Sequence, residues 1–269
     1  MLKPHLVSLR EEAPLIHNMV SHVSANDCAN FLLALGASPI MAEEKLEMEA
    51  LSQVAKGLHL NLGTITTYRF EAMKEVILAY SRMGLPIVLD PVGIASSPYR
   101  LASVQTLLDL AVPRVIRGNY AELMCLSGLA TEEKGVDSTL SYERIKSDLN
   151  RLLETSALLG TIFVLSGKED LLIGQGKVVK VSNGHPMMAR LTGCGCMQSA
   201  LLAGLLAVGE DDFEACLYGV TLMGVLGERA GKRLDKTKGN LSFKLALFDE
   251  AFHAQDEQII QGARYEEIR

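Results

Sequence analysis

The chain has 269 residues, of which 48% are hydrophobic and 22% charged, and 26 Lys and Arg against 32 Asp and Glu give a net charge of −6. This balance excludes an intrinsically disordered chain, and a pI of about 5.6 argues against a nucleic-acid partner. No apolar run reaches the roughly 18–20 residues that span a bilayer, and residues 1–18 lack the apolar core of a secretion signal. We therefore expect a cytoplasmic globular protein without membrane partners, with one domain over residues 1–269.

Short apolar runs alternate along the chain with longer stretches of helical spacing. The predicted strands are residues 38–41, 58–63, 86–90, 114–119 and 161–167. The predicted helices are residues 23–35, 70–83, 142–153, 199–208 and 213–226. Continuously apolar strands separated by helices indicate an α/β fold, with a mostly parallel central sheet flanked by helices on both faces.

The second half of the chain follows a different pattern. Residues 171–184 combine turn glycines with alternating apolar residues, which predicts an antiparallel hairpin. Only helices are expected after it, from about Cys196 onward. The polar tail, residues 261–269, is expected to fray.

Polar side chains and glycines follow the predicted strands. Ligands of parallel α/β sheets bind at the carboxyl ends of the strands. The residues found there are Met41 to Glu43, Gly63 and Thr64, Asp90, Arg117 to Asn119, Glu122, and Ser166 to Lys168. Any one of them could be a helix cap or a turn residue, but the whole series predicts a binding site at this edge.

A glycine-rich turn precedes the apolar helix predicted at residues 199–208. Gly193 and Gly195 let the backbone turn tightly and approach a ligand. The N-terminus of a buried helix offers free N–H groups and the positive end of the helix dipole, so the turn is a candidate anion site. It lacks the Lys-Ser/Thr of a P-loop and the spacing of a dinucleotide fingerprint.

The five cysteines are scattered and odd in number, which does not suit a disulfide framework. Cys28, Cys125 and Cys216 are expected to be apolar core residues. Cys194 and Cys196 do not have C-x-x-C spacing, and a metal site there would need further ligands. The first turn of a helix lowers a thiol pKa, so Cys196 is expected to favour the thiolate. Cysteine catalysis would also need a base, for which His185 is the nearest histidine in the sequence.

Five stretches together resemble the hydroxyethylthiazole kinases, a family of the ribokinase-like superfamily. They are residues 16–41, 61–64, 86–93, 115–122 and 191–204. The first stretch is the most discriminating, with Asn18-x-Val20, Asn26-x-x-Ala29-Asn30 and a Gly-Ala-Ser-Pro-x-Met segment that ends at Met41. The resemblance implies transfer of a phosphoryl group from ATP, with Mg²⁺, to the hydroxyl of 4-methyl-5-(2-hydroxyethyl)thiazole in thiamine salvage. It also implies a homotrimer with sites between subunits.

The same resemblance assigns roles to residues of this chain. Asp90 and Glu122 would hold Mg²⁺, largely through water. The residues implied for ATP are Arg117, Asn119 and Ser166. Those implied for the thiazole alcohol are Asn18, Val20, Met41, Gly63 and Gly193. Catalysis would use Gly193, Gly195 and Cys196, the glycine turn serving as an anion hole for the transferring phosphoryl group.

One position departs from most ribokinase-like enzymes, which carry an Asp as general base where this chain has Cys196. Because a loose phosphoryl-transfer transition state needs little help from a base, our hypothesis is that Cys196 orients the reaction rather than drives it. Three alternatives stay open. They are a hydroxymethylpyrimidine or pyridoxal kinase, a hydro-lyase that repairs hydrated nicotinamide nucleotides, and a non-catalytic thiazole or nucleotide sensor.

Overall fold

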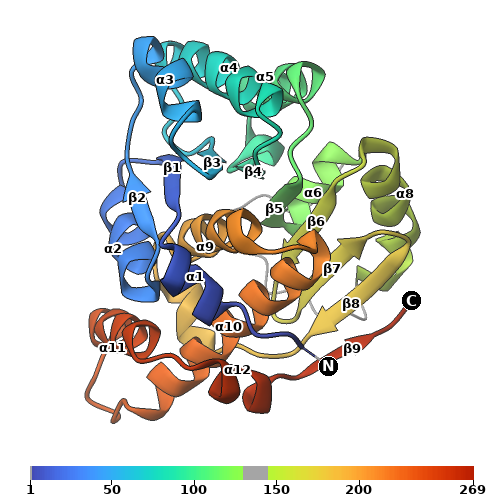
Figure 1. Cartoon of the computed structure of the whole chain (residues 1–269). Coiled ribbons are helices and arrows are strands. Elements are labelled where there is room, and N and C mark those ends of the chain that lie inside the picture. Colours follow the sequence, from blue (N-terminus) through green and yellow to red (C-terminus); the bar gives the residue numbers. More distant parts are fainter. Residues whose placement is uncertain (1, 130–144) are drawn as a thin grey trace.

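The computed structural model describes residues 2–129 and 145–269. Its strands form one sheet in the order β2-β1-β3-β4-β5-β6-β7-β8-β9 (Figure 1). Their bounds are β1 (Leu15–Met19), β2 (Ser38–Ile40), β3 (Gly57–Asn61), β4 (Ile87–Asp90), β5 (Val115–Asn119), β6 (Ile162–Ser166), β7 (Asp170–Gly174), β8 (Lys177–Val181) and β9 (Tyr265–Glu267). The pairings from β2 across to β6 are parallel, and those from β6 to β9 are antiparallel.

Helices cover both faces of the sheet, as the alternation of apolar runs predicted. One face carries α1 (Leu6–Glu12), α2 (Ala25–Leu35), α9 (Cys194–Val208), α10 (Asp212–Lys232), α11 (Asn240–Phe252) and α12 (Asp256–Gly262). The other carries α3 (Met48–Ser52), α4 (Thr67–Arg82), α5 (Pro98–Leu110), α6 (Tyr120–Leu126) and α8 (Leu149–Leu159). None of the helices in the described ranges has the length and hydropathy that crossing a membrane requires.

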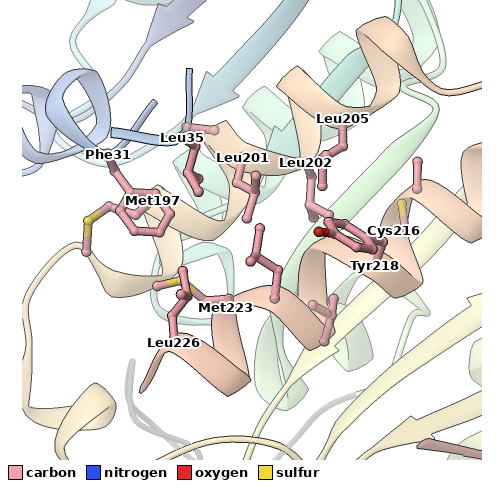
Figure 2. Close-up of a cluster of buried hydrophobic side chains, with 14 of the residues drawn as sticks. Phe31, Leu35, Met197, Leu201, Leu202, Leu205, Cys216, Tyr218, Met223 and Leu226 are labelled. Carbon is pink, nitrogen blue, oxygen red and sulfur yellow. The ribbon is translucent and has the colours of Figure 1, made fainter. Parts of the chain in front are cut away.

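Helix α9 lies at the centre of its layer. Its sequence is apolar or small on every side, which is the pattern of a fully buried helix. Figure 2 shows Met197 and Leu201 of α9 in one buried cluster with Phe31 of α2 and Leu226 of α10. Each of these side chains is essentially inaccessible, and burying one contributes roughly 1.5–3 kcal/mol. This packing fixes the helix, and therefore the position of its N-terminus relative to the sheet.

The five strands predicted from apolar runs are confirmed, with ends shifted by one or two residues. Strand β1 was not predicted, because the polar residues His17 and Asn18 interrupt its apolar pattern. The structure accommodates His17 in the core, where its ring nitrogens contact Tyr80 Oη at 3.1 Å and the Ala42 carbonyl at 2.9 Å. The helix predicted at 142–153 begins outside the described residues, and within them α8 begins at Leu149.

The antiparallel hairpin is confirmed as β7 and β8, but the prediction for the tail was wrong. Residues 265–267 form β9 and pair with β8. The Val178 N–H donates to the Arg269 carbonyl at 2.7 Å, and the Ser182 N–H donates to the Arg264 carbonyl at 2.8 Å. The unpaired backbone edge of β8 holds this segment, and a polar side-chain pattern carries no signal of such an edge.

Candidate active site

The register of the parallel strands gathers the predicted polar residues on the face that α9 covers. Asn61 at the end of β3 is the direct partner of Asp90 at the end of β4. Leu89 pairs with Ile116, so Asp90 lies beside Arg117 of β5. Asn61, Asp90 and Arg117 therefore form one row across three strands, beneath the first turns of α9.

Asp90 is the central side chain of this row and is 1% exposed. Its Oδ2 accepts hydrogen bonds from Asn61 Nδ2 at 2.8 Å and from Ser199 Oγ of α9 at 3.1 Å. Its Oδ1 is buried without a hydrogen-bond partner. Burial raises the pKa of Asp90, an effect that the neighbouring Arg117 charge and these two hydrogen bonds oppose. The free oxygen is thus available to a cation or to a bound water.

Glu122 is a second buried carboxylate, held at the start of α6. It forms a capping box with Asn119: the Glu122 N–H donates to Asn119 Oδ1 at 3.0 Å, and the Asn119 N–H donates to Glu122 Oε2 at 2.8 Å. The Gly93 N–H donates to Oε1 at 2.8 Å. Burial, and then the charge of Asp90, raise the pKa of Glu122 to about 7. Two carboxylates that disfavour each other's charge are a natural place for a cation.

The N-terminus of α9 faces this row. The helix begins after Gly193, whose φ of +83° is left-handed and favours glycine. The N–H groups of Gly195 and Cys196 donate to no acceptor within the described ranges, so both are free for an anion. A Cβ at Gly195 would lie 2.8 Å from Arg117 Cζ, so a larger residue at this position would displace the guanidinium. The guanidinium of Arg117 packs directly against the helix end.

The thiol of Cys196 lies in this same turn, 3.3 Å from Asn61 Nδ2. Burial, and then the neighbouring Asp90 carboxylate, raise the pKa of Cys196 to about 11. This direction is opposite to the one that its place in the first turn of the helix favours. Burial likewise raises the pKa of Cys194 to about 12.

His185 takes no part in this site. Its ring stacks on Phe243 with 5.4 Å between centroids, and it lies against Gly231 of α10. The idea of a Cys–His pair therefore has no support in the structure. No cluster of three or more His, Cys, Asp or Glu side chains suited to a metal occurs in the part of the chain that the structure describes.

The residues assigned to the alcohol lie on the β1, β2 and β3 side of the turn. Met41 follows β2 and is 38% exposed, whereas Val20 is buried in the core. Gly63 donates its N–H to Asn61 Oδ1 at 2.8 Å, and a Cβ at Gly193 would lie 2.9 Å from Ser24 Cβ.

Asn18 lies within strand β1, in the sheet layer and not in the loops that follow the strands. It is buried and bonds inward, since its Nδ2 donates to the Ile16 carbonyl at 2.9 Å and its Oδ1 lies 3.2 Å from His59 Nδ1. Ser166 ends β6 on the other side of the row. It pairs in register with Asn119, and its Oγ donates to the Gly118 carbonyl at 3.4 Å.

Several residues of the site have no role in the sequence analysis. They are Asn61, Arg69, Asp170, Gln198 and Ser199. Asn61 had a detectable signal, because it is a polar residue at the end of an apolar strand. Gln198 and Ser199 lie within an apolar helix, and only the register of the sheet beneath α9 shows what they contact.

Arg69 of α4 ties together the loops of the alcohol side, although it is 2% exposed. Its guanidinium donates to the Val20 carbonyl at 2.7 Å and to the Gly63 carbonyl at 2.8 Å. It also donates to the carbonyl of Thr64 and to its Oγ1, and forms an ion pair with Glu43 at 3.0 Å. Thr64 has a φ of +51°, a strained conformation for a β-branched residue that these bonds hold in place.

We expect Arg69→Met to lower the free energy of unfolding by about 2–4 kcal/mol, because it leaves several buried carbonyls without donors. Chemical denaturation measures the change. Arg82→Met on the same helix is the matched control, since Arg82 pairs with Glu49 on the exposed surface and such pairs contribute little. Equal stability of the two variants would contradict the role given to Arg69.

Comparisons with known proteins agree with this geometry at the level of fold. A ribokinase-like superfamily protein from Enterococcus faecalis superimposes with a TM-score of 0.65, at 17% identity, over 93% of this chain and 89% of that chain. The chain therefore has the ribokinase-like fold, in which a helix N-terminus faces the row of Asn61, Asp90 and Arg117.

Relatives with higher sequence identity show to which family of this fold the chain belongs. The model of the hydroxyethylthiazole kinase family matches residues 6–257. A hydroxyethylthiazole kinase from Clostridium acetobutylicum is 37% identical over 99% of both chains. The solved hydroxyethylthiazole kinase from Pyrococcus horikoshii superimposes with a TM-score of 0.86, at 28% identity, over 98% of both chains. The chain belongs to the hydroxyethylthiazole kinase family.

Proposed function

We propose that this chain transfers the γ-phosphoryl group of ATP to the hydroxyl of 4-methyl-5-(2-hydroxyethyl)thiazole, in thiamine salvage. The observation that carries the proposal is the row of Asn61, Asp90 and Arg117 beneath the free N–H groups of α9. Because one sheet runs through the described residues, we also propose that residues 1–269 act as a single kinase domain.

Phosphoryl transfer needs positioning and neutralisation of charge more than covalent chemistry. The N–H groups of Gly195 and Cys196 would donate hydrogen bonds to the transferring phosphoryl oxygens, and Arg117 would supply the positive charge beside them. Arg117, Asn119 and Ser166 lie on the β5 and β6 side of the turn, where we place the nucleotide. A few such groups suffice for phosphate in a chain of net charge −6.

Asp90 and Glu122 have the chemistry of a Mg²⁺ site. Mg²⁺ is commonly held by one or two carboxylates together with phosphate oxygens and water, so no larger cage is needed. The unpartnered Oδ1 of Asp90 and the raised pKa of Glu122 both indicate charge that a cation would neutralise. When bound, the ion would supply positive charge that neutralises the charge developing on the phosphate oxygens.

We place the thiazole alcohol on the opposite side of the turn, against Met41, Val20, Gly63 and Gly193. Asn18 would support this pocket from within the sheet layer, through its hydrogen bonds with the Ile16 carbonyl and the His59 ring. Met and Val side chains suit a small, largely apolar ring. The support is position alone: these residues converge on the end of α9 that would hold the phosphoryl group.

Cys196 would orient the reacting groups rather than remove the proton. A thiol with a pKa of about 11 is protonated at neutral pH. As the pH rises toward that value, the fraction of thiolate increases tenfold per pH unit. A catalytic thiolate would therefore make kcat rise with pH. We expect kcat to stay level between pH 7 and 9, and to fall by less than about tenfold in Cys196→Ser, because loss of a true general base costs roughly 10²–10⁴-fold. Steady-state kinetics across this range measures both; a rising wild-type profile that the variant lacks would make Cys196 the base.

The chain would assemble as a homotrimer, with sites between subunits. Apolar side chains stand exposed on two neighbouring helices, namely Val23 just before α2, Leu33 on α2, and Leu241 and Leu245 on α11. An isolated monomer has little reason to expose so many on one region. Sedimentation equilibrium is expected to give three times the 29.2 kDa chain mass, and a monomer at assay concentration would contradict the assembly.

Substrate identity is tested by ADP release with a panel of alcohols. Turnover is expected with the thiazole alcohol and with Mg²⁺, and not with hydroxymethylpyrimidine or pyridoxal. Turnover of either of those, or of a hydrated nicotinamide nucleotide, in place of the thiazole alcohol would favour the corresponding relative. Binding of the thiazole alcohol without any turnover would favour a sensor.

A further inference from the structure

Arg117 is held by a neutral amide rather than by a carboxylate. Its Nε donates to Gln198 Oε1 at 3.0 Å. No ion pair of Arg117 occurs among the described residues. Gln198 is 4% exposed and lies on α9, one turn beyond Gly195. Within residues 2–129 and 145–269, the one hydrogen bond of the guanidinium therefore comes from the helix whose N-terminus it faces.

The amide of Gln198 is fixed at both ends. Its Nε2 donates to Asp170 Oδ2 at 3.4 Å, and Asp170 Oδ1 accepts the Gly167 N–H at 2.9 Å. A guanidinium can only donate and an ionised carboxylate can only accept, so the amide has one orientation that satisfies both neighbours. A chain of hydrogen bonds thus runs from the loop after β6, through Asp170 and Gln198, to Arg117.

The hydrogen bond to Gln198 occupies the side of the Arg117 guanidinium that points away from the helix end. Nε is occupied, whereas Nη1 and Nη2 lie against Gly195, beside the two free N–H groups. A carboxylate in place of the amide would neutralise the positive charge, but an amide orients Arg117 and leaves that charge available. The two remaining nitrogens form the flat edge that pairs with phosphate oxygens.

We propose that Gln198, supported by Asp170, is a positioning residue that aims Arg117 at the nucleotide phosphates. The inference rests on the proposed function, because it assumes that a nucleotide binds at this turn. Gln198 would not touch the nucleotide itself. Its effect on binding would pass entirely through Arg117, and this distinguishes it from a residue that merely supports the fold.

A double-mutant cycle on ADP binding tests this, using calorimetry with ADP and Mg²⁺. We expect Gln198→Met to raise the Kd for ADP roughly tenfold in the wild-type background, within the range of couplings between contacting residues. The same substitution should leave the Kd unchanged in an Arg117→Met background. Gln105→Met, on the exposed surface of α5, is the matched control and should leave the Kd unchanged.

Gln198→Glu tests whether the amide of Gln198 orients Arg117 or whether the side chain only fills its volume in the structure. It keeps the length of the side chain, but sets a carboxylate against Asp170 and neutralises Arg117, so ADP binding should weaken at least as much as in Gln198→Met. If Gln198→Met does not fold, Asp170→Ala carries the same cycle, because it removes the acceptor of Gln198 Nε2.

The proposal is overturned by a folded Gln198→Met with wild-type ADP affinity, or by an equal loss in both backgrounds. Failure of the proposed function is distinguishable. If the wild type binds ADP with the expected coupling but does not phosphorylate the thiazole alcohol, only the substrate assignment fails. If the wild type binds no ADP, both proposals fail.

Discussion

Gly195→Ala should lower kcat/KM for the phosphoryl transfer by about 10²-fold or more. The added Cβ would lie 2.8 Å from Cζ and Nη2 of Arg117 and closer still to Nη1. The guanidinium must then move away from the helix end, and a displacement of about 1 Å in a catalytic group can cost 10²-fold. Initial rates at varied ATP concentration measure the loss.

The fold should tolerate this substitution, because Gly195 does not need a left-handed φ and alanine favours helices. Gly204→Ala in the same helix is the matched control. A Cβ there would approach Leu9 Cδ1 at 3.4 Å, an ordinary contact. We expect full activity and a Tm that is unchanged or slightly higher. Wild-type activity in Gly195→Ala would contradict the position given to Arg117.

Asp90→Asn should lower kcat by roughly 10²–10³-fold, the cost of removing one preorganised electrostatic group. The substitution conserves volume but removes the charge that we assign to Mg²⁺. Because burial raises the pKa of Asp90, its ionised form opposes folding, so the variant should unfold at the same temperature as the wild type or higher. Rate measurements and thermal denaturation without Mg²⁺ together test this opposite effect on activity and stability.

Ser199→Ala is the control for Asp90→Asn. It removes one hydrogen bond to the carboxylate, at 3.1 Å, and leaves the charge in place. A loss of about tenfold is expected, the lower end of what one hydrogen bond to a charged group contributes. If Ser199→Ala were as damaging as Asp90→Asn, the hydrogen-bond network rather than the charge would account for the loss.

The sequence predicted the layers of this fold well, because a parallel sheet covered on both faces gives continuous apolar runs separated by helices. It did not reveal β1, where His17 and Asn18 find hydrogen-bond partners inside the fold. Nor did it reveal β9, which the backbone edge of β8 recruits. In both cases the missing information was a contact between segments distant in sequence.

The candidate site likewise has features that could be predicted from the sequence and features that could not. The positions of Asp90, Arg117 and Glu122 were predictable, because each lies near the carboxyl end of a strand, at the edge where parallel sheets bind ligands. The ionisation of Cys196 was not, since its position in the helix favours a thiolate but its burial next to Asp90 outweighs that effect. Gln198 could not be assigned, because its role depends on which strand residues lie beneath α9.

The most direct test of this account is to incubate the wild-type chain with ATP, Mg²⁺ and 4-methyl-5-(2-hydroxyethyl)thiazole and to follow the products by phosphorus NMR. The account predicts a new phosphate monoester of the thiazole alcohol, formed in equal amount with ADP. It also predicts that neither product accumulates without Mg²⁺, and that both form at least about 10²-fold more slowly in Asp90→Asn. An unchanged thiazole alcohol with wild-type protein that binds ADP, or full turnover in Asp90→Asn, would contradict it.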